Sequence, residues 1–358
     1  MSSADEKRTS REIDAQIAKD REQMVARMSK EPKVLLLGSG DSGKTTFMKQ
    51  LKIIHGNGYS SEERAAFLRA AHENILDSAH GLILAAAEMG ISPAKSGVED
   101  AMENIKEFFQ SRSKEMTPKL IGAIETIWAD ENIRSILPLP PDSKVFIQDT
   151  AAYFLSKVRA IGQSDHVLTD EDILNIRLPT TQITETVFVI EQYHFHIYDV
   201  AGQQKHRKHW IPFFDSVNQI LFFISLASYD QFLVEDPTIN RMHDALGLFG
   251  EICNHPLLKH IPITLFMNKM DLFETKLQTS QIKRFFPDFN KENNLKYGAR
   301  YFEKKFRAQY DTAEVEPENA KLIYCHLTCC TDTKAMGVII SNVLQSMLVK
   351  SLRTGGLM

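Results

Sequence analysis

The chain has 358 residues, more than one small domain needs, and its 43% hydrophobic and 25% charged residues are typical of a globular protein. The net charge of −4 gives no general basic character, so nucleic acid is not an expected partner. No apolar run reaches the length of a membrane span, and the cysteines, of which Cys253 is the first, lack zinc-ligand spacing, which indicates free thiols in a reducing compartment.

Within the N-terminal segment 1–30, residues 6–30 are dense in charge, and Ile13, Ile17, Met24 and Met28 recur among them at helical spacing. This pattern predicts an amphipathic helix, and its polar start is unlike a secretory signal peptide. Two interpretations of the helix remain open. It is either a solvated, frayed terminus or a helix that docks on a partner protein.

A phosphate-binding loop follows the first predicted strand, which covers residues 33–37. Residues 38–45 fit the pattern G-x-x-x-x-G-K-[ST] at every fixed position, and a helix is expected over 45–55. The Lys44 side chain can reach the outer phosphates, and the Thr45 hydroxyl can hold Mg²⁺. The residues expected at the phosphates are Gly38, Ser39, Gly40, Asp41, Ser42, Gly43, Lys44, Thr45 and Thr46.

Residues 59–176 contain no convincing alternating strand and have helical spacing in stretches such as 65–87 and 153–161. They predict an all-helical domain with its own core. After residue 183 apolar strand patterns return and alternate with helices, which predicts an α/β domain with a parallel sheet covered on both faces. The expected strands are a hairpin over 188–198 and runs at 220–226, 263–267 and 322–327, followed by an amphipathic helix over 332–352. The predicted α/β domain is therefore discontinuous, comprising residues 31–58 and 177–358, with the helical domain inserted.

The base of the nucleotide is indicated by Asn268, Lys269 and Asp271, which follow directly from the predicted strand 263–267. A carboxylate at a strand end can accept both N–H donors of the guanine ring edge, and adenine lacks these donors. A site built around such donors rejects the analogue strongly, because the Asp271 carboxylate would be left unpaired.

Residues 199–203 read Asp-Val-Ala-Gly-Gln and also follow a strand. Asp199 can hold the Mg²⁺ shell through water, the Gly202 N–H can meet the terminal phosphate, and Gln203 can orient an attacking water. Thr180 offers a second hydroxyl to Mg²⁺. These positions predict a site that senses the terminal phosphate as well as binding it.

With these motifs in this order, the chain resembles the alpha subunits of heterotrimeric G proteins over nearly its whole length. Further segments that carry the resemblance are Leu-Lys-Ile-Ile-His at 51–55, Asp-Thr-Ala-Ala-Tyr at 149–153, Asn-Arg-Met-His at 240–243 and Thr-Cys-Cys-Thr-Asp-Thr-Lys at 328–334. The resemblance implies a Ras-like P-loop GTPase fold, GTP and GDP as ligands, Mg²⁺ as cofactor, and slow intrinsic GTP hydrolysis.

The resemblance also implies roles for individual residues. Arg177 corresponds to the arginine that the family supplies in cis to neutralise charge on the transferred phosphoryl group, so Arg177 and Gln203 form the expected catalytic pair. The further residues expected at the nucleotide are Asp149, Thr150, Leu174, Arg177, Thr180, Asp199, Gly202, Asn268, Lys269, Asp271, Cys329, Cys330 and Thr331.

In the implied mechanism the terminal phosphate orders two loops, 175–185 and 200–215, and hydrolysis releases them. The second loop carries four large apolar residues, which are either core residues or a surface that partners contact in one state only. They are Trp210, Ile211, Phe213 and Phe214. The implied partners are a beta-gamma dimer, a seven-helix membrane receptor that contacts the C-terminal tail, and a downstream effector.

Several residues depart from the family pattern. Ser2 stands where most members have glycine, and no early cysteine is present, so neither N-myristoylation nor N-terminal palmitoylation is expected. We therefore expect a partly cytosolic protein that reaches the cytoplasmic face of the plasma membrane through partners. Ala201 and Gln182 replace glycines, Pro179 replaces a lysine, and Asp41 replaces a glutamate.

These departures leave the Mg²⁺ ligands and the pair Arg177 and Gln203 in place, so we expect intact binding and slow hydrolysis. Two other functions remain as alternatives. The first is a GTP-binding scaffold with little useful hydrolysis, which the residues Ala201 and Gln182 motivate. The second, a P-loop kinase or ATPase, is disfavoured by Asn268 and Asp271.

Overall fold

The computed structural model describes residues 31–111, 115–141, 143, 145–180, 182–190, 192–215, 217–311 and 321–354. The helix predicted over 1–30 and the C-terminal tail 355–358 lie outside the described residues. Among those described, no helix is both long and apolar enough to cross a membrane.

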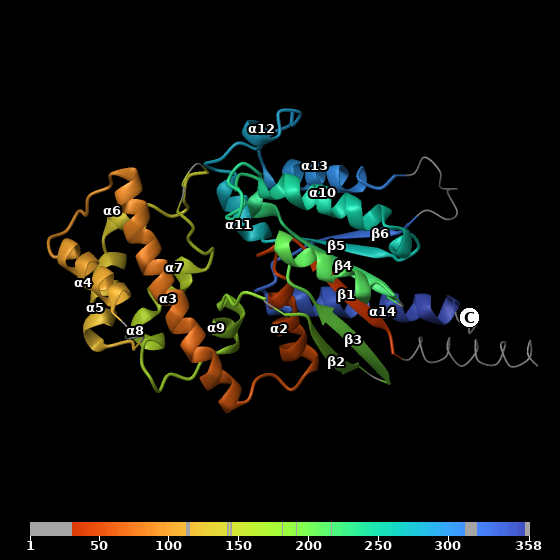
Figure 1. The fold of residues 1–358 in the computed structure, drawn as a ribbon, viewed down its shortest axis with the longest axis horizontal. Helices are drawn as coiled ribbons and strands as arrows, with labels where there is room; N and C mark the ends of the chain where they lie inside the picture. Colours follow the sequence, from red (N-terminus) through yellow and green to blue (C-terminus); the bar gives the residue numbers. More distant parts are fainter. Residues whose placement is uncertain are drawn as a thin grey trace, which may run out of the picture.

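A six-stranded sheet forms the centre of one half of the molecule (Figure 1). Its order is β2 (Thr184–Ile190), β3 (Tyr193–Asp199), β1 (Lys33–Gly38), β4 (Gln219–Ser225), β5 (Ile263–Asn268) and β6 (Ile323–Leu327). Only β2 runs antiparallel to its neighbour, as one arm of the predicted hairpin, which begins at Thr184 instead of Phe188. The α/β class is thereby confirmed, and the parallel strands end at one common edge.

Helices cover both faces of this sheet, as the apolar strand runs predict. On one face α2 (Lys44–His55) and α14 (Thr333–Thr354) pack through residues such as Phe47 and Met336. On the other face lie α10 (Arg241–Asn254), α11 (Met270–Lys276), α12 (Ile282–Phe285) and α13 (Leu295–Arg307), around an aromatic-rich core. In Figure 1, α10 and α13 lie above β4, β5 and β6, and α14 lies below these three strands.

Short 3₁₀ helices connect the strands at η1 (Gln204–His209), η2 (Ile211–Phe213), η3 (Leu226–Ser228) and η4 (Pro256–Leu258). The four large apolar residues of loop 200–215 differ in their burial. Trp210 and Phe214 belong to the core, Phe213 packs partly against it, and Ile211 is 55% exposed. Core packing therefore accounts for part of this cluster, and Ile211 remains on the surface.

The other half of the molecule is a helical unit with a separate hydrophobic core, at the left of Figure 1. It contains α3 (Ser61–Met89), α4 (Val98–Gln110), α5 (Pro118–Trp128), α6 (Glu131–Arg134), α7 (Ala151–Ser156), α8 (Val158–Ile161) and α9 (Asp170–Asn175). The described residues between 59 and 176 include no strand. A capping box of Ser60 and Glu63 begins α3, and Gly90 in the left-handed conformation ends it.

Candidate functional site

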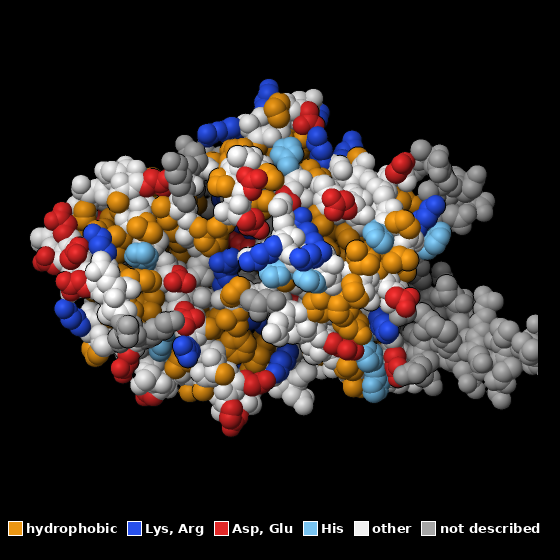
Figure 2. Space-filling model, in the orientation of Figure 1, with side chains coloured by type: hydrophobic (Ala, Val, Ile, Leu, Met, Phe, Trp, Pro, Cys, Tyr) orange, Lys and Arg blue, Asp and Glu red, His pale blue; other side chains and the backbone are white. Residues whose placement is uncertain are grey.

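A cavity of about 650 Å³ lies between the helical unit and the edge at which the parallel strands end. Figure 2 shows Lys, Arg and His side chains gathered in the middle of the viewed face, where the two units meet. Of the residues predicted at the nucleotide and the catalytic centre, all line the cavity except Gly38, Ser39 and Asp199. Those lining it are Gly40, Asp41, Ser42, Gly43, Lys44, Thr45, Thr46, Asp149, Thr150, Leu174, Arg177, Thr180, Gly202, Gln203, Asn268, Lys269, Asp271, Cys329, Cys330 and Thr331.

The phosphate loop turns tightly from β1 into α2. Gly43 has φ +104°, and a Cβ there would lie 2.1 Å from the Asn268 side-chain nitrogen, so only glycine fits. Gly43 is also the N-cap residue of α2 and offers no side-chain cap. The N–H groups of the first turn of α2 therefore remain available to an anion, and the helix dipole adds to its attraction.

Lys44 is buried with its ammonium group folded against the loop. Its Nζ donates hydrogen bonds to the carbonyl oxygens of Gly38 at 2.9 Å and Ser39 at 2.8 Å. Burial lowers the pKa of Lys44 to about 8, although the Asp199 carboxylate opposes that shift. A Cβ on Gly202 would lie 2.4 Å from this Nζ, so the loop after β3 packs closely against the Lys44 side chain.

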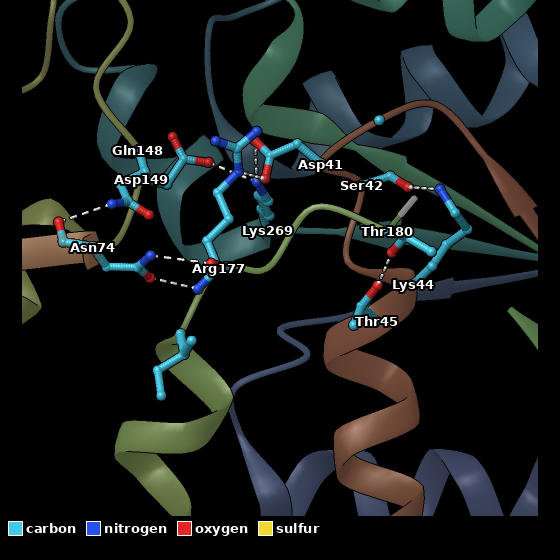
Figure 3. Close-up of polar contacts among 12 residues, drawn as sticks. Asp41, Ser42, Lys44, Thr45, Asn74, Gln148, Asp149, Arg177, Thr180 and Lys269 are labelled. Carbon is cyan, nitrogen blue, oxygen red and sulfur yellow. Dashed lines mark hydrogen bonds and ion pairs between the residues drawn. The ribbon is translucent and has the colours of Figure 1, made fainter. Parts of the chain in front are cut away.

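The three predicted Mg²⁺ residues converge, although they come from three different segments. Thr45 Oγ1 lies 2.7 Å from Thr180 Oγ1 (Figure 3). It also donates a hydrogen bond to Asp199 Oδ2 at 3.1 Å. The other oxygen, Asp199 Oδ1, is buried without a hydrogen-bond partner, and burial raises the pKa of Asp199 against the opposing effects of Lys44 and Thr45. Hydroxyl and carboxylate oxygens are the donors that Mg²⁺ prefers, so these residues fit the ion.

Arg177 follows α9 and contacts three residues, Asn74, Asp41 and Phe146. Its N–H donates to Asn74 Oδ1 at 2.6 Å, and its carbonyl accepts from Asn74 Nδ2 at 3.0 Å. Its Nε lies 3.5 Å from Asp41 Oδ1, and its guanidinium carbon lies 4.8 Å from the centroid of the Phe146 ring. The Arg177 side chain thus lies beside the phosphate loop, next to the Asp41 carboxylate.

Asp41 joins three cations in the cavity. Besides Arg177, its Oδ2 lies 3.2 Å from Lys269 Nζ and 3.4 Å from Arg241 Nη2. Burial alone would raise the pKa of Asp41, but Lys269, Arg241 and Arg177 hold it far below its usual value. Lys269 Nζ also pairs with Asp149 Oδ2 at 2.7 Å, so one lysine connects the phosphate loop with the helical unit.

At the end of the cavity where the base is expected, both polar atoms of the Asn268 side chain bond to the protein. Its Nδ2 donates to the Ser42 carbonyl at 2.9 Å, and its Oδ1 accepts from the Cys330 N–H at 2.9 Å. Asn268 therefore braces the phosphate loop against the loop 328–331. Asp271 is exposed and lines the cavity, and its side chain also contacts Cys329 in the loop 328–331.

Gln203 is exposed and lies beside the phosphate loop, since a Cβ on Gly40 would be 3.6 Å from Gln203 Cγ. The preceding Ala201 is buried, and its carbonyl accepts from Trp210 Nε1 at 3.1 Å. Among the described non-glycine residues, positive φ occurs at Asp41 and Lys269. Ala201 is therefore unstrained in this conformation.

Several residues around the site were not expected from sequence. Arg241 lies in a segment that the family resemblance includes, but the residues gave no indication that it pairs with Asp41 and donates to the Gly40 carbonyl. Phe146, Gln148 and Lys49 also line the cavity. Gln148 and Lys49 lie close to the motifs at 149–153 and 51–55 but outside them, and no motif covers Phe146.

Comparisons with known proteins show the family to which the chain is similar. A family model described as "G-protein alpha subunit" matches residues 7–347. The chain is 34% identical over 352 residues to "Guanine nucleotide-binding protein subunit alpha" of Cryptococcus neoformans, covering 98% of this chain and 78% of that protein. It is 35% identical over 349 residues to "Guanine nucleotide-binding protein alpha-1 subunit" of Neurospora crassa, covering 97% and 95%. A subunit alpha of Sporothrix schenckii is 34% identical, with the same coverage.

Proposed function

This chain belongs to the G-protein alpha subunit family, and from that premise we propose which of its residues bind the nucleotide, hold Mg²⁺ and cleave the terminal phosphate. The chain is a guanine nucleotide-binding alpha subunit of a heterotrimeric G protein. It binds GTP and GDP, acts as a molecular switch and hydrolyses GTP. The observation that carries the residue assignments is that the segments 38–45, 199–203 and 268–271 meet at one cavity.

Phosphate binding is assigned to the loop 38–45 and to the first turn of α2. When phosphate enters, the Lys44 ammonium group exchanges the carbonyls of Gly38 and Ser39 for phosphate oxygens. A phosphate also restores the charged form that burial disfavours, because an adjacent anion raises the pKa of an ammonium group. The carboxylate of Asp271 accepts from the guanine edge, while Asn268 keeps the two loops in register.

Hydrolysis is assigned to two side chains at the phosphate end. Gln203 orients the attacking water, and the Arg177 guanidinium neutralises charge that develops on the transferred phosphoryl group. To do so, Arg177 must leave Asp41, whose carboxylate remains paired with Lys269 and Arg241. Thr45, Thr180 and, through water, Asp199 would hold Mg²⁺, which supplies positive charge at the phosphate oxygens when bound.

We also infer the partners that this class of switch requires. A beta-gamma dimer, a seven-helix receptor and an effector are each expected to distinguish the GTP form from the GDP form. Loop 200–215, with Ile211 exposed, and loop 175–185, with Leu178 exposed, can both report this difference. Attachment to the cytoplasmic face of the plasma membrane through these partners is part of the same proposal.

Radiolabelled GTP and ATP, followed for binding and for phosphate release, test the assignment on the purified chain. We expect tight binding of GTP, none of comparable strength for ATP, and slow release of phosphate. The Gln203→Leu variant should keep GTP binding and lose hydrolysis. Unchanged turnover in that variant would show that Gln203 is assigned wrongly, and GTP binding without any phosphate release would support the scaffold alternative.

A further inference from the structure

We propose that Asn74, on helix α3 of the helical unit, is a positioning residue that fixes the backbone of Arg177 for GTP hydrolysis. This inference rests on the proposed catalytic role of Arg177. It gives the helical unit a part in the reaction, although α3 contains none of the predicted nucleotide-binding residues.

The geometry of the pair is specific. The Asn74 amide meets both polar groups of the Arg177 backbone, accepting from the N–H at 2.6 Å and donating to the carbonyl at 3.0 Å (Figure 3). Arg177 lies after the end of α9 and before β2, outside any helix or strand. Its backbone N–H and carbonyl therefore have no hydrogen-bond partners within a helix or sheet. The Asn74 side chain supplies both partners instead.

Asn74 is itself rigidly held. It lies in the interior of α3 and is 6% exposed. Its backbone carbonyl accepts hydrogen bonds from Ser78 Oγ at 2.7 Å and Gln148 Nε2 at 3.0 Å. Gln148 precedes Asp149, whose carboxylate pairs with Lys269 of the guanine motif. We call the two hydrogen bonds from Asn74 to the Arg177 backbone the clamp on Arg177. Residues 148–149 therefore contact both this clamp and Lys269.

Fixing the backbone of Arg177 limits where its guanidinium can go. With N–H and carbonyl held, only side-chain torsions remain for the movement from Asp41 toward a phosphate. Without Asn74 the backbone after α9 gains freedom, and that freedom must be lost again in each transition state, which slows the reaction. Asn74 does not line the cavity, so contacts to guanine and to the phosphates should persist.

Single-turnover hydrolysis of preloaded GTP, with Mg²⁺ in the buffer, tests this role in four proteins: the parent, Asn74→Ala, Arg177→Ala and the double variant. We expect Asn74→Ala to slow hydrolysis about tenfold, as the loss of two backbone contacts suggests. Affinity for a non-hydrolysable GTP analogue should change much less. In the Arg177→Ala background, Asn74→Ala should cause no further loss, because both changes remove one function.

His72→Ala is the matched control, since His72 lies on the same helix and bonds to the Ile161 carbonyl at 2.7 Å without contacting Arg177. It should hydrolyse GTP at the parental rate. Asn74→Asp keeps the acceptor for the Arg177 N–H and removes the donor to its carbonyl. It should therefore be impaired too, which covers the case in which Asn74→Ala does not fold.

The possible failures are distinguishable. Equal slowing by Asn74→Ala with and without Arg177, or a parental rate in both Asn74 variants, overturns the positioning role. A parental rate in Arg177→Ala contradicts the catalytic role of Arg177 in the proposed function, whatever the Asn74 variants do.

Discussion

Lys49 is a buried lysine whose ammonium group contacts neutral groups. It is 4% exposed, and its Nζ donates to the carbonyls of Ile173 at 2.8 Å and Ile176 at 2.5 Å. Burial lowers the pKa of Lys49 from 10.5 to about 7. The side chain joins α2 to the end of α9, so it contributes to holding the helical unit against the phosphate-loop helix.

The depressed pKa of Lys49 predicts how stability depends on pH. Between about pH 7 and about pH 9 the unfolded state keeps this proton while the folded state loses it, so Lys49 makes the free energy of unfolding rise with pH. Chemical unfolding of GDP-loaded protein across this range should show a smaller slope against pH in Lys49→Met than in the parent. Lys52→Met, on the same helix, should leave the slope unchanged, and equal slopes in all three proteins would contradict the assignment.

The positions of single site residues could be predicted from the sequence where those residues lie at the end of a predicted strand. Asp199 is the last residue of β3, and Lys44 and Asp271 lie shortly after β1 and β5. Parallel strands end at one edge, so the placement of all three residues at that edge follows from topology. Arg241 and Phe146 could not be predicted in this way. Their places depend on how α10 and the segment before α7 pack, which no short pattern encodes.

At the level of elements, strands and long helices were predictable because their periodicity is strong. The last strand was expected over 322–327 and covers Ile323–Leu327, and the helix expected over 65–87 lies within α3. The hairpin was placed too short because β2 is an edge strand whose first residues, Thr184 and Glu185, are polar and exposed. A strand that faces solvent lacks the apolar run by which the central strands are identified.

The N-terminus of α3 offers a prediction about one element. Ser60 Oγ accepts from the Glu63 N–H at 3.3 Å, and Glu63 Oε2 accepts from the Ser60 N–H at 3.0 Å, which forms a capping box. Ser60→Ala leaves the Glu63 N–H without its side-chain acceptor. Unfolding in urea should therefore show a free energy of unfolding that is about 1 kcal/mol lower.

Thr126→Ala is the contrasting change within a helix. Thr126 Oγ1 donates back to the Gly122 carbonyl in α5, an interaction that does not cap a helix end. We expect this variant to be as stable as the parent or slightly more stable, because alanine is the better helix former. A loss equal to that of Ser60→Ala would mean that the cap is not the source of the effect.

For the whole molecule, the placement of the two units bears on nucleotide release. Residues of both units line the cavity, so we expect a bound nucleotide to leave faster when the units separate. The described contacts across this boundary include the pair Asp149 and Lys269, the clamp of Asn74 on Arg177, and Lys49 on the end of α9. None of these involves a large apolar surface, which permits opening without disturbing either core.

Asp149→Asn should therefore speed the release of GDP. The change removes the carboxylate that lies 2.7 Å from Lys269 Nζ, while Lys269 keeps its pair with Asp41 at 3.2 Å. The pair is partly exposed, so its loss should reduce the free energy that favours the closed arrangement of the two units by about 1 kcal/mol. Release of GDP should therefore be about fivefold faster. Dissociation of a fluorescent GDP analogue, followed after excess GDP is added, measures this rate.

Glu125→Gln gives the control, because it breaks the exposed pair of Glu125 with Arg159 inside the helical unit and leaves the boundary between the units intact. Its release rate should equal that of the parent. If Asp149→Asn also releases GDP at the parental rate, closure does not depend on this charge pair. The clamp on Arg177 and the contacts of Lys49 must then suffice, and a combined Asn74→Ala and Lys49→Met variant should release GDP faster than either single variant.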